Sequence, residues 1–146
     1  MILCEVSRTI GAAPHVLFEF LVDVQNMQVW RDEVRSVWLA DGATGVVGAL
    51  YGVVAREPGS DLDLPIPIRL TAAEPDVRID LELRSGLVTL GSGFRLAPDG
   101  EGTELVICRS FDGPLPLTRR LAKGAIEKAV EDGEAIAAVF ERAVDR

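Results

Sequence analysis

The C-terminal segment constrains the fold of this chain more than any other feature of the sequence. From Pro116 to Arg146, apolar residues recur at spacings of three and four, which is typical of one face of an α-helix. The recurring positions are Leu117, Leu121, Ala125, Ile126, Ala129, Val130, Gly133, Ile136, Ala137, Phe140 and Val144. A single helix of this length would run roughly 40 Å, whereas the preceding strands can reach only about 20–30 Å. Such a helix must cross a whole sheet.

Short strands precede this segment at intervals of about ten residues. We expect them at residues 2–10, 33–40, 47–57, 66–73, 77–84, 87–96 and 103–111. Turn residues separate the strands, for example at 58–61, and the short connections favour an antiparallel meander. Two short helices are expected between the first two strands, one beginning at Pro14 and the other running from about Asp23 to Trp30.

Length and charge limit the number of domains and the class of partner. A chain of 146 residues that is 48% hydrophobic predicts one domain over residues 1–146. The net charge of −8 makes nucleic acid and anionic membranes poor partners. The longest weakly polar stretch, Gly45 to Ala55, is too short to span a bilayer. The first residues lack the pattern of a secretory signal, so we expect a cytoplasmic protein.

Metal and cofactor chemistry have little support in the residue types. Two cysteines and one histidine cannot complete a tetrahedral zinc site, and no glycine-rich stretch has the spacing of a phosphate-binding loop. We therefore expect no metal and no cofactor. Cys4 and Cys108 should be reduced thiols that pack as small apolar residues. His15 follows Pro14 at a helix start, where it should face solvent rather than act as a base.

The order of these segments resembles the START-like superfamily, in particular its polyketide cyclase and dehydrase branch. The resemblance covers nearly the whole chain and rests on Val6–Ile10, Ala13–Pro14, Phe18, Asp23, Trp30, Val34, Val37, Val47–Gly48, Glu74–Pro75, Phe94–Pro98 and Gly102–Leu105. It implies an α+β helix-grip fold. In that fold a curved, seven-stranded antiparallel sheet wraps around a long C-terminal helix, with two short helices between strands one and two.

The resemblance also implies an apolar cavity between the sheet and the long helix, which takes lipids, polyketides or aromatic compounds. The inward positions that would bind such a ligand are Tyr51, Val53, Ile68, Leu70, Ile79, Leu81, Leu90, Phe94, Ile107, Arg109, Phe111, Ile126, Val130 and Gly133. This lining is mostly aliphatic. It suits a ligand held by burial, at roughly 25 cal/mol per Å² of apolar area.

Two polar side chains stand out among these inward positions. Arg109 shares strand parity with Ile107 and Phe111, and a buried guanidinium needs acceptor oxygens. It could anchor a ligand carboxylate or polarise a ketone, or it could reach solvent or pair with an acidic residue. Arg8, on the apolar side of the first strand, has the same alternatives. The Tyr51 phenol could donate to a ligand carbonyl, although a core position with its hydroxyl at the rim is the commoner case.

Two glycines interrupt the C-terminal helical pattern. Each costs about 1 kcal/mol relative to alanine inside a helix, so Gly124 and Gly133 predict a bend, close backbone packing or space for a ligand. The small residues around Gly133 make it the first place to expect the cavity. The acidic residues of the helix should mostly form a solvated face.

Binding of a small hydrophobic molecule is therefore the first functional hypothesis, in a monomer or a homodimer. A cofactor-free polyketide cyclase, aromatase or dehydratase is the alternative, with Arg109 and Tyr51 as its catalytic residues. The second alternative is an interaction module whose cavity is filled by its own side chains. Fold-level resemblance cannot choose among them.

Overall fold

An antiparallel sheet with strand order β1-β7-β6-β5-β4-β3-β2 forms the frame of the molecule in the computed structural model, which describes residues 1–55 and 65–144. The strands are β1 (Ile2–Ile10), β2 (Val34–Asp41), β3 (Leu50–Ala55), β4 (Ile66–Glu74), β5 (Arg78–Ser85), β6 (Val88–Asp99) and β7 (Gly102–Asp112). These bounds confirm the predicted strands to within a few residues. The last two residues of the strand predicted at 47–57, the turn predicted at 58–61 and the last two residues of the predicted helix lie outside the described residues.

Strand register places the predicted inward positions on one face of the sheet. Directly opposed residues of an antiparallel pair point to the same side, and side chains alternate along each strand. The opposed sets across β5, β6 and β7 are Ile79, Phe94 and Ile107; Leu81, Ser92 and Arg109; and Leu83, Leu90 and Phe111. The period-two pattern of the sequence is thereby confirmed as the inner face of the sheet.

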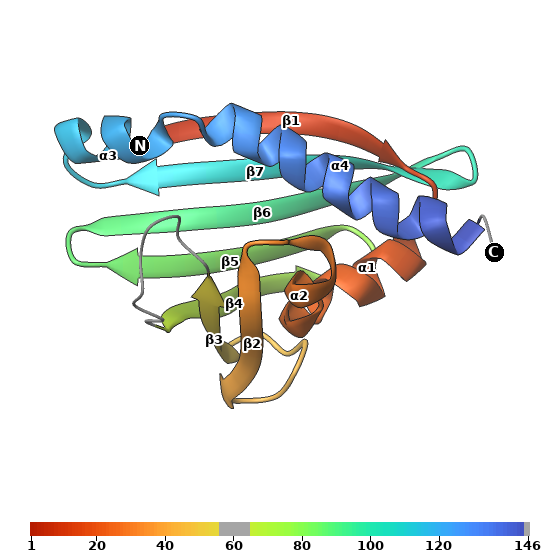
Figure 1. Ribbon diagram of the computed structural model, residues 1–146, viewed down its shortest axis with the longest axis horizontal. Coiled ribbons are helices and arrows are strands. Elements are labelled where there is room, and N and C mark those ends of the chain that lie inside the picture. The colour runs from red at the N-terminus through yellow and green to blue at the C-terminus, as the bar shows by residue number, and fades with distance from the viewer. Residues whose placement is uncertain (56–64, 145–146) are drawn as a thin grey trace.

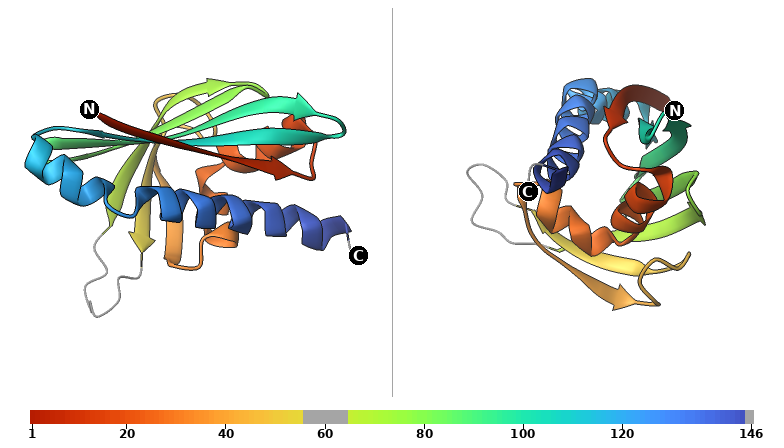
Figure 2. Two further views of the ribbon diagram at one scale, coloured as in Figure 1. Left: turned by 90° about the horizontal axis from the view of Figure 1, so that it is seen from above. Right: turned by 90° about the vertical axis from the view of Figure 1, so that its right-hand side faces the viewer.

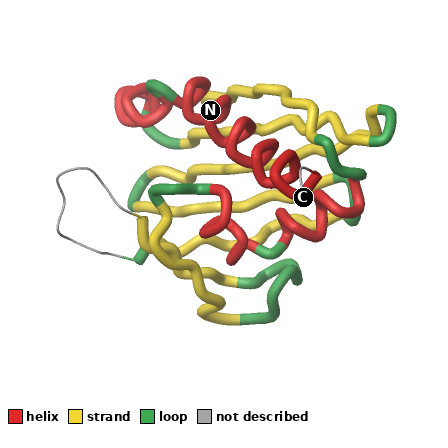
Figure 3. The backbone as a smooth tube through the Cα atoms, turned by 45° about the vertical axis from the view of Figure 1, so that its right-hand side comes forward, coloured by secondary structure: helices red, strands yellow, loops and turns green. Residues whose placement is uncertain are grey.

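Short helices connect β1 to β2 and close one end of the curved sheet. They are α1 (Pro14–Val22), the 3₁₀ turn η1 (Val24–Asn26) and α2 (Met27–Trp30). Pro14 occupies the first turn of α1, where a missing backbone N–H costs nothing. Asp23 accepts a hydrogen bond from the Gln25 amide at 3.1 Å and so starts η1. Figure 3 shows these helices gathered with the C-terminal helices in front of the strands.

The C-terminal helical segment consists of two helices, α3 (Leu115–Ala122) and α4 (Ala125–Val144). This corrects the prediction of one continuous helix. Gly124 has a φ of +80°, a left-handed conformation that ends α3 and that glycine adopts without strain. Both helices lie on one face of the sheet (Figure 2), and α4 runs obliquely past β1 and β7 to end beside α1 (Figure 1). The bend predicted at the glycines is located at Gly124.

The buried face of α4 differs from the predicted stripe. Ala129, Ile136 and Ala137 are buried as expected, but Ile126 and Val130 are 56% and 48% exposed. A Cβ at Gly133 would lie 3.3 Å from the Cβ of Arg8, so this glycine permits close packing of α4 on β1. The space beside Gly133 is thus filled, which corrects the expectation that the cavity lies there.

Two further properties follow from the described residues. None of the helices within residues 1–55 and 65–144 combines the length and apolar content that a membrane span needs. In the same residues, no group of three or more His, Cys, Asp or Glu side chains is placed to hold a metal ion.

Candidate functional site

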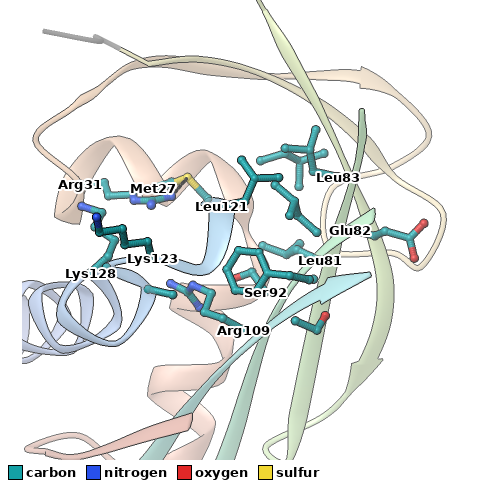
Figure 4. A pocket seen from close by; sticks show the side chains of 17 residues that line it. Met27, Arg31, Leu81, Glu82, Leu83, Ser92, Arg109, Leu121, Lys123 and Lys128 are labelled. Atoms are coloured by element: carbon teal, nitrogen blue, oxygen red, sulfur yellow. Dashed lines mark hydrogen bonds between the residues drawn. The ribbon is translucent and has the colours of Figure 1, made fainter. Parts of the chain in front are cut away.

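A cavity of about 370 Å³ lies beneath the junction of α3 and α4 (Figure 4). Its walls come from the inner face of the sheet, from α2 and from residues around the helix break. The lining residues are Met27, Arg31, Ile68, Leu81, Glu82, Leu83, Leu90, Gly91, Ser92, Arg109, Ser110, Phe111, Leu121, Lys123, Gly124, Ala125 and Lys128. This volume falls within the range of small-molecule sites, about 300–1,000 Å³.

One side of the cavity is apolar. Leu81 and Leu83 project from β5, and Leu121 faces them from α3 (Figure 4). Leu90 and Phe111 are opposed in register and extend the same surface across β6 and β7. Together they form a patch that can bury a hydrocarbon or an aromatic ring.

The other side of the cavity is cationic. The nitrogen atoms of Arg31, Lys123, Lys128 and Arg109 gather there, away from Leu83 (Figure 4). Glu82 also lines the cavity, but its carboxylate points away from the four cations. The polar and apolar groups are therefore segregated.

Arg109 is held by a carboxylate on α4. Its Nη2 donates to Oδ2 of Asp132 at 2.6 Å, and the two side chains are 12% and 2% exposed. Burial lowers the pKa of Arg109, and the adjacent Asp132 carboxylate opposes that shift. Because an arginine titrates far above neutral pH, the guanidinium remains charged and the ion pair stays intact.

Asp132 also approaches two other cations of the cavity. Its Oδ1 lies 3.4 Å from Nζ of Lys128 and 3.6 Å from Nε of Arg31. Glu33 completes the cluster, since its Oε1 forms an ion pair with Lys128 and lies 3.2 Å from Nε of Arg31. The exposed Glu131 carboxylate also lies 3.7 Å from Nζ of Lys128, so three cations share three carboxylates, Asp132, Glu33 and Glu131.

The ion pair between Glu33 and Lys128 shifts the pKa values of both side chains. Partial burial would raise the pKa of Glu33, but the Lys128 hydrogen bond and nearby positive charges outweigh it and lower that pKa. Burial would lower the pKa of Lys128, but the hydrogen bond with Glu33 and the charge of Asp132 outweigh it and raise that pKa. Both groups are thereby kept in their charged forms.

The structure distributes the predicted ligand-binding residues over three environments. Ile68, Leu81, Leu90, Arg109 and Phe111 line the cavity. Ile126 and Val130 lie on the outer face of α4, and Gly133 packs against β1. The others are buried in the core rather than in the cavity wall: Tyr51, Val53, Leu70, Ile79, Phe94 and Ile107.

Tyr51, the second predicted catalytic residue, lies apart from the cavity lining. Its side chain is fully buried, and its hydroxyl accepts a hydrogen bond from the Gly45 amide at 3.0 Å. The phenol oxygen is therefore already hydrogen bonded to a loop of the protein. Arg8, the other anomalous arginine, forms an ion pair at 3.1 Å with Glu134 of α4. It ties β1 to α4 without facing the cavity.

Sequence reasoning missed the charged residues that complete the site: Arg31, Glu33, Lys123, Lys128 and Asp132. The expected solvated face of acidic residues would include Asp132, although this residue is three positions after Ala129 and four before Ile136. That spacing was a usable signal, because both neighbours are fully buried. For the other four residues we find no comparable signal in the sequence.

Comparison with known families and structures gives consistent matches for the fold. A family described as "Polyketide cyclase / dehydrase and lipid transport" matches residues 1–145. The search of curated proteins gives no significant match.

Three solved structures illustrate the similarity. A START superfamily protein from Mycobacterium smegmatis aligns with a TM-score of 0.74 and 13% identity over 97% of this chain and 98% of its own. Ara h 8.0201 has the same TM-score and coverage at 17% identity. The di-domain ARO/CYC protein BexL, from the BE-7585A biosynthetic pathway, aligns with a TM-score of 0.80 and 10% identity over 100% of this chain and 48% of its own. At these identities the matches show the fold alone.

Proposed function

Because the chain belongs to the polyketide cyclase/dehydrase and lipid transport family, we propose that it binds a small hydrophobic molecule in the cavity beneath the α3–α4 junction. The observation that supports this most directly is the concave apolar wall formed by Leu81, Leu83, Leu90, Phe111 and Leu121. Each Å² of apolar ligand surface removed from water there would contribute roughly 25 cal/mol.

Binding is favoured over catalysis by the positions of the candidate catalytic groups. Tyr51 is hydrogen bonded to Gly45 and does not line the cavity. Arg109 is held by Asp132, so its charge is already neutralised within the protein. General acid–base catalysis requires a proton donor or acceptor within hydrogen-bond reach of the reacting atoms. With Tyr51 outside, the cavity lacks one of the two residues to which the cyclase hypothesis assigns catalysis.

The test compares two tryptophan substitutions of serine. Ser92 lies on the inner face of β6 between Leu81 and Arg109, so Ser92→Trp places an indole in the cavity. Ser7→Trp places the same group on the exposed outer face of β1 and is the matched control. Native mass spectrometry of each purified protein reports any apolar molecule that is retained.

We expect wild type and Ser7→Trp to retain the same ligand and Ser92→Trp to lose it, with near-UV circular dichroism showing that all three proteins are folded. Retention of the ligand by a folded Ser92→Trp protein would reject this cavity as the binding site. No retained ligand and no binding of added apolar probes by wild type would reject the binding function.

A further inference from the structure

We propose that the molecule bound in this cavity is an amphiphile with one anionic group, such as a carboxylate or a sulfonate, which lies on the cationic side near Lys123 and Lys128. This inference rests on the proposed function and specifies the chemistry of its ligand. The apolar body of the ligand would contact the leucine side of the cavity, opposite the anion.

The charge of the cavity lining contrasts with the charge of the whole chain. The chain has a net charge of −8, yet four cations and one carboxylate line the cavity. That carboxylate, on Glu82, points away from the cations (Figure 4). A concave site lined by one sign of charge concentrates ligands of the opposite sign. The lining that a ligand meets is therefore mainly cationic although the protein as a whole is anionic, and the charge of Lys123 is the one that no ion pair offsets within the described residues.

The positive charges that line the cavity are not all paired with carboxylates of the described residues. Asp132, Glu33 and Glu131 pair with Arg109, Arg31 and Lys128, so the positive charge without a paired carboxylate is that of Lys123. Lys123 forms no ion pair with any described residue. The Nε of Arg31 is buried and, within the described residues, donates no hydrogen bond of good geometry. A partly desolvated cation gains stability from an added acceptor, so a ligand anion would complete the cluster.

The cations that line the cavity differ in how far they are buried. Arg109 and Asp132 form the most buried pair, so Arg109 acts as a positioning residue that fixes the α4 carboxylate. Lys123 follows α3 directly at the helix break and Lys128 is 37% exposed, so both remain accessible. Lys123 is therefore the group that a ligand can reach without competing with an ion pair, whereas Lys128 is also held by Glu33 and Asp132.

The competing explanation is that the charged cluster only joins α2, α4 and β7. A purely structural network would not distinguish an anionic ligand from its neutral counterpart. Anilinonaphthalene sulfonate and N-phenylnaphthylamine are suitable probes, because they share one aromatic skeleton and differ by the sulfonate. Their fluorescence increases on entering an apolar site, so both affinities can be measured by titration.

The decisive measurement is the effect of Lys123→Gln on each probe. Loss of one partly exposed cation should weaken sulfonate binding about fivefold and leave binding of the neutral probe within about twofold. Lys123→Arg should restore sulfonate affinity. Arg120→Gln, which removes an exposed cation of α3 outside the cavity, is the matched control and should change neither affinity.

Two further measurements complete the experiment: the salt dependence of probe affinity, and probe binding to the Ser92→Trp variant. Sulfonate affinity should fall between about 0.05 M and 1 M salt, while the neutral probe should not weaken. Ser92→Trp should abolish binding of both probes, which shows that they occupy this cavity. If Lys123→Gln affects both probes equally or neither, the anionic-ligand inference is overturned while hydrophobic binding stands. If wild type binds neither probe, both the inference and the proposed function fail.

Discussion

The two halves of α4 have opposite environments although they continue one helical repeat. The first half, residues 125–132, contributes Ala125 and Lys128 to the cavity and Asp132 to the ion pairs beside it. The second half, residues 133–141, packs against β1, β7 and α1 and contributes no residue to that cavity. There the Gly133 backbone approaches Arg8, and Phe140 meets Phe20 edge to face at 5.4 Å.

This difference shows which side chains make a helix pack closely against the sheet and which leave a cavity beside it. In the second half, small residues bring α4 close to the sheet, and aromatic contacts fill the remaining space. In the first half, the charged side chains of Lys128 and Asp132 take the place of apolar side chains that would fill the core. The ion pairs hold the helix in position while leaving space beside them. The following substitutions test this division.

Asp132→Ala should have the largest effect and should destabilise the first half. Removing the carboxylate leaves Arg109 buried without its partner and takes an anion from Lys128. Breaking one side of a buried ion pair costs about 3 kcal/mol or more. We therefore expect the free energy of unfolding, measured by urea denaturation, to fall by about that amount.

The matched control is Glu131→Ala, which removes the neighbouring carboxylate; this side chain is 71% exposed and lies 3.7 Å from Nζ of Lys128, so solvent screens the pair. Its unfolding free energy should change by less than about 0.5 kcal/mol. Equal effects of the two substitutions would mean that the ion pairs of the first half do not hold α4 in place.

Gly133→Leu should have the next largest effect and tests the second half. A side chain here would overlap Arg8 and Ile107, whose nearest atoms lie 3.3 and 3.5 Å from an added Cβ. Overpacking should destabilise the protein by about 2 kcal/mol, even though removing a helical glycine contributes up to about 1 kcal/mol in its favour.

Ala125→Leu is the corresponding change in the first half, because Ala125 lines the cavity. There the added leucine should change stability by less than about 1 kcal/mol and should instead weaken probe binding. Similar losses of stability at both positions would contradict the distinction between a packed half and an open half.

The fold could be predicted from the sequence because its strands carry strong local patterns. The alternation in β5 and the tight turns between strands specify which side chains face inward. The rotation of α4 could not be predicted from hydrophobicity alone. Ile126 and Val130 are more apolar than Asp132, yet the helix turns Asp132 inward because Arg109 compensates its charge. That compensation depends on a partner 23 positions away in the chain.

The site was less predictable than the fold for the same reason. Arg109 could be singled out, since a charged residue interrupted an apolar strand pattern. Lys123 and Lys128 looked like ordinary surface positions, and they face the cavity because α3 ends at Gly124. A glycine in a helical pattern indicates a weak point, but its cost does not distinguish a gentle bend from a complete break.

Gly124→Ala should have a moderate effect and tests the break that separates α3 from α4. The φ of +80° is costly for any residue with a Cβ, while the surroundings leave open space for one. We expect a loss of about 1 kcal/mol from backbone strain alone. Thermal denaturation can measure this loss. Gly124→Asn should be less destabilising, because asparagine tolerates the left-handed conformation better. Equal stability of wild type and Gly124→Ala would show that the break does not depend on glycine.

Glu33→Gln should have the smallest effect and tests whether the charged cluster contributes stability to the first half. Because the folded-state pKa of Glu33 is lowered from its ordinary value of 4.5, the carboxylate stabilises the fold at higher pH. That contribution is lost as the pH falls through the lowered pKa. Solvent screens the partly exposed pair with Lys128, so the difference from wild type should stay below about 1 kcal/mol. Urea denaturation at a series of pH values should show this difference at neutral pH and its decline below pH 4.5. A difference that persists unchanged to about pH 3 would mean that Glu33 acts through packing rather than charge.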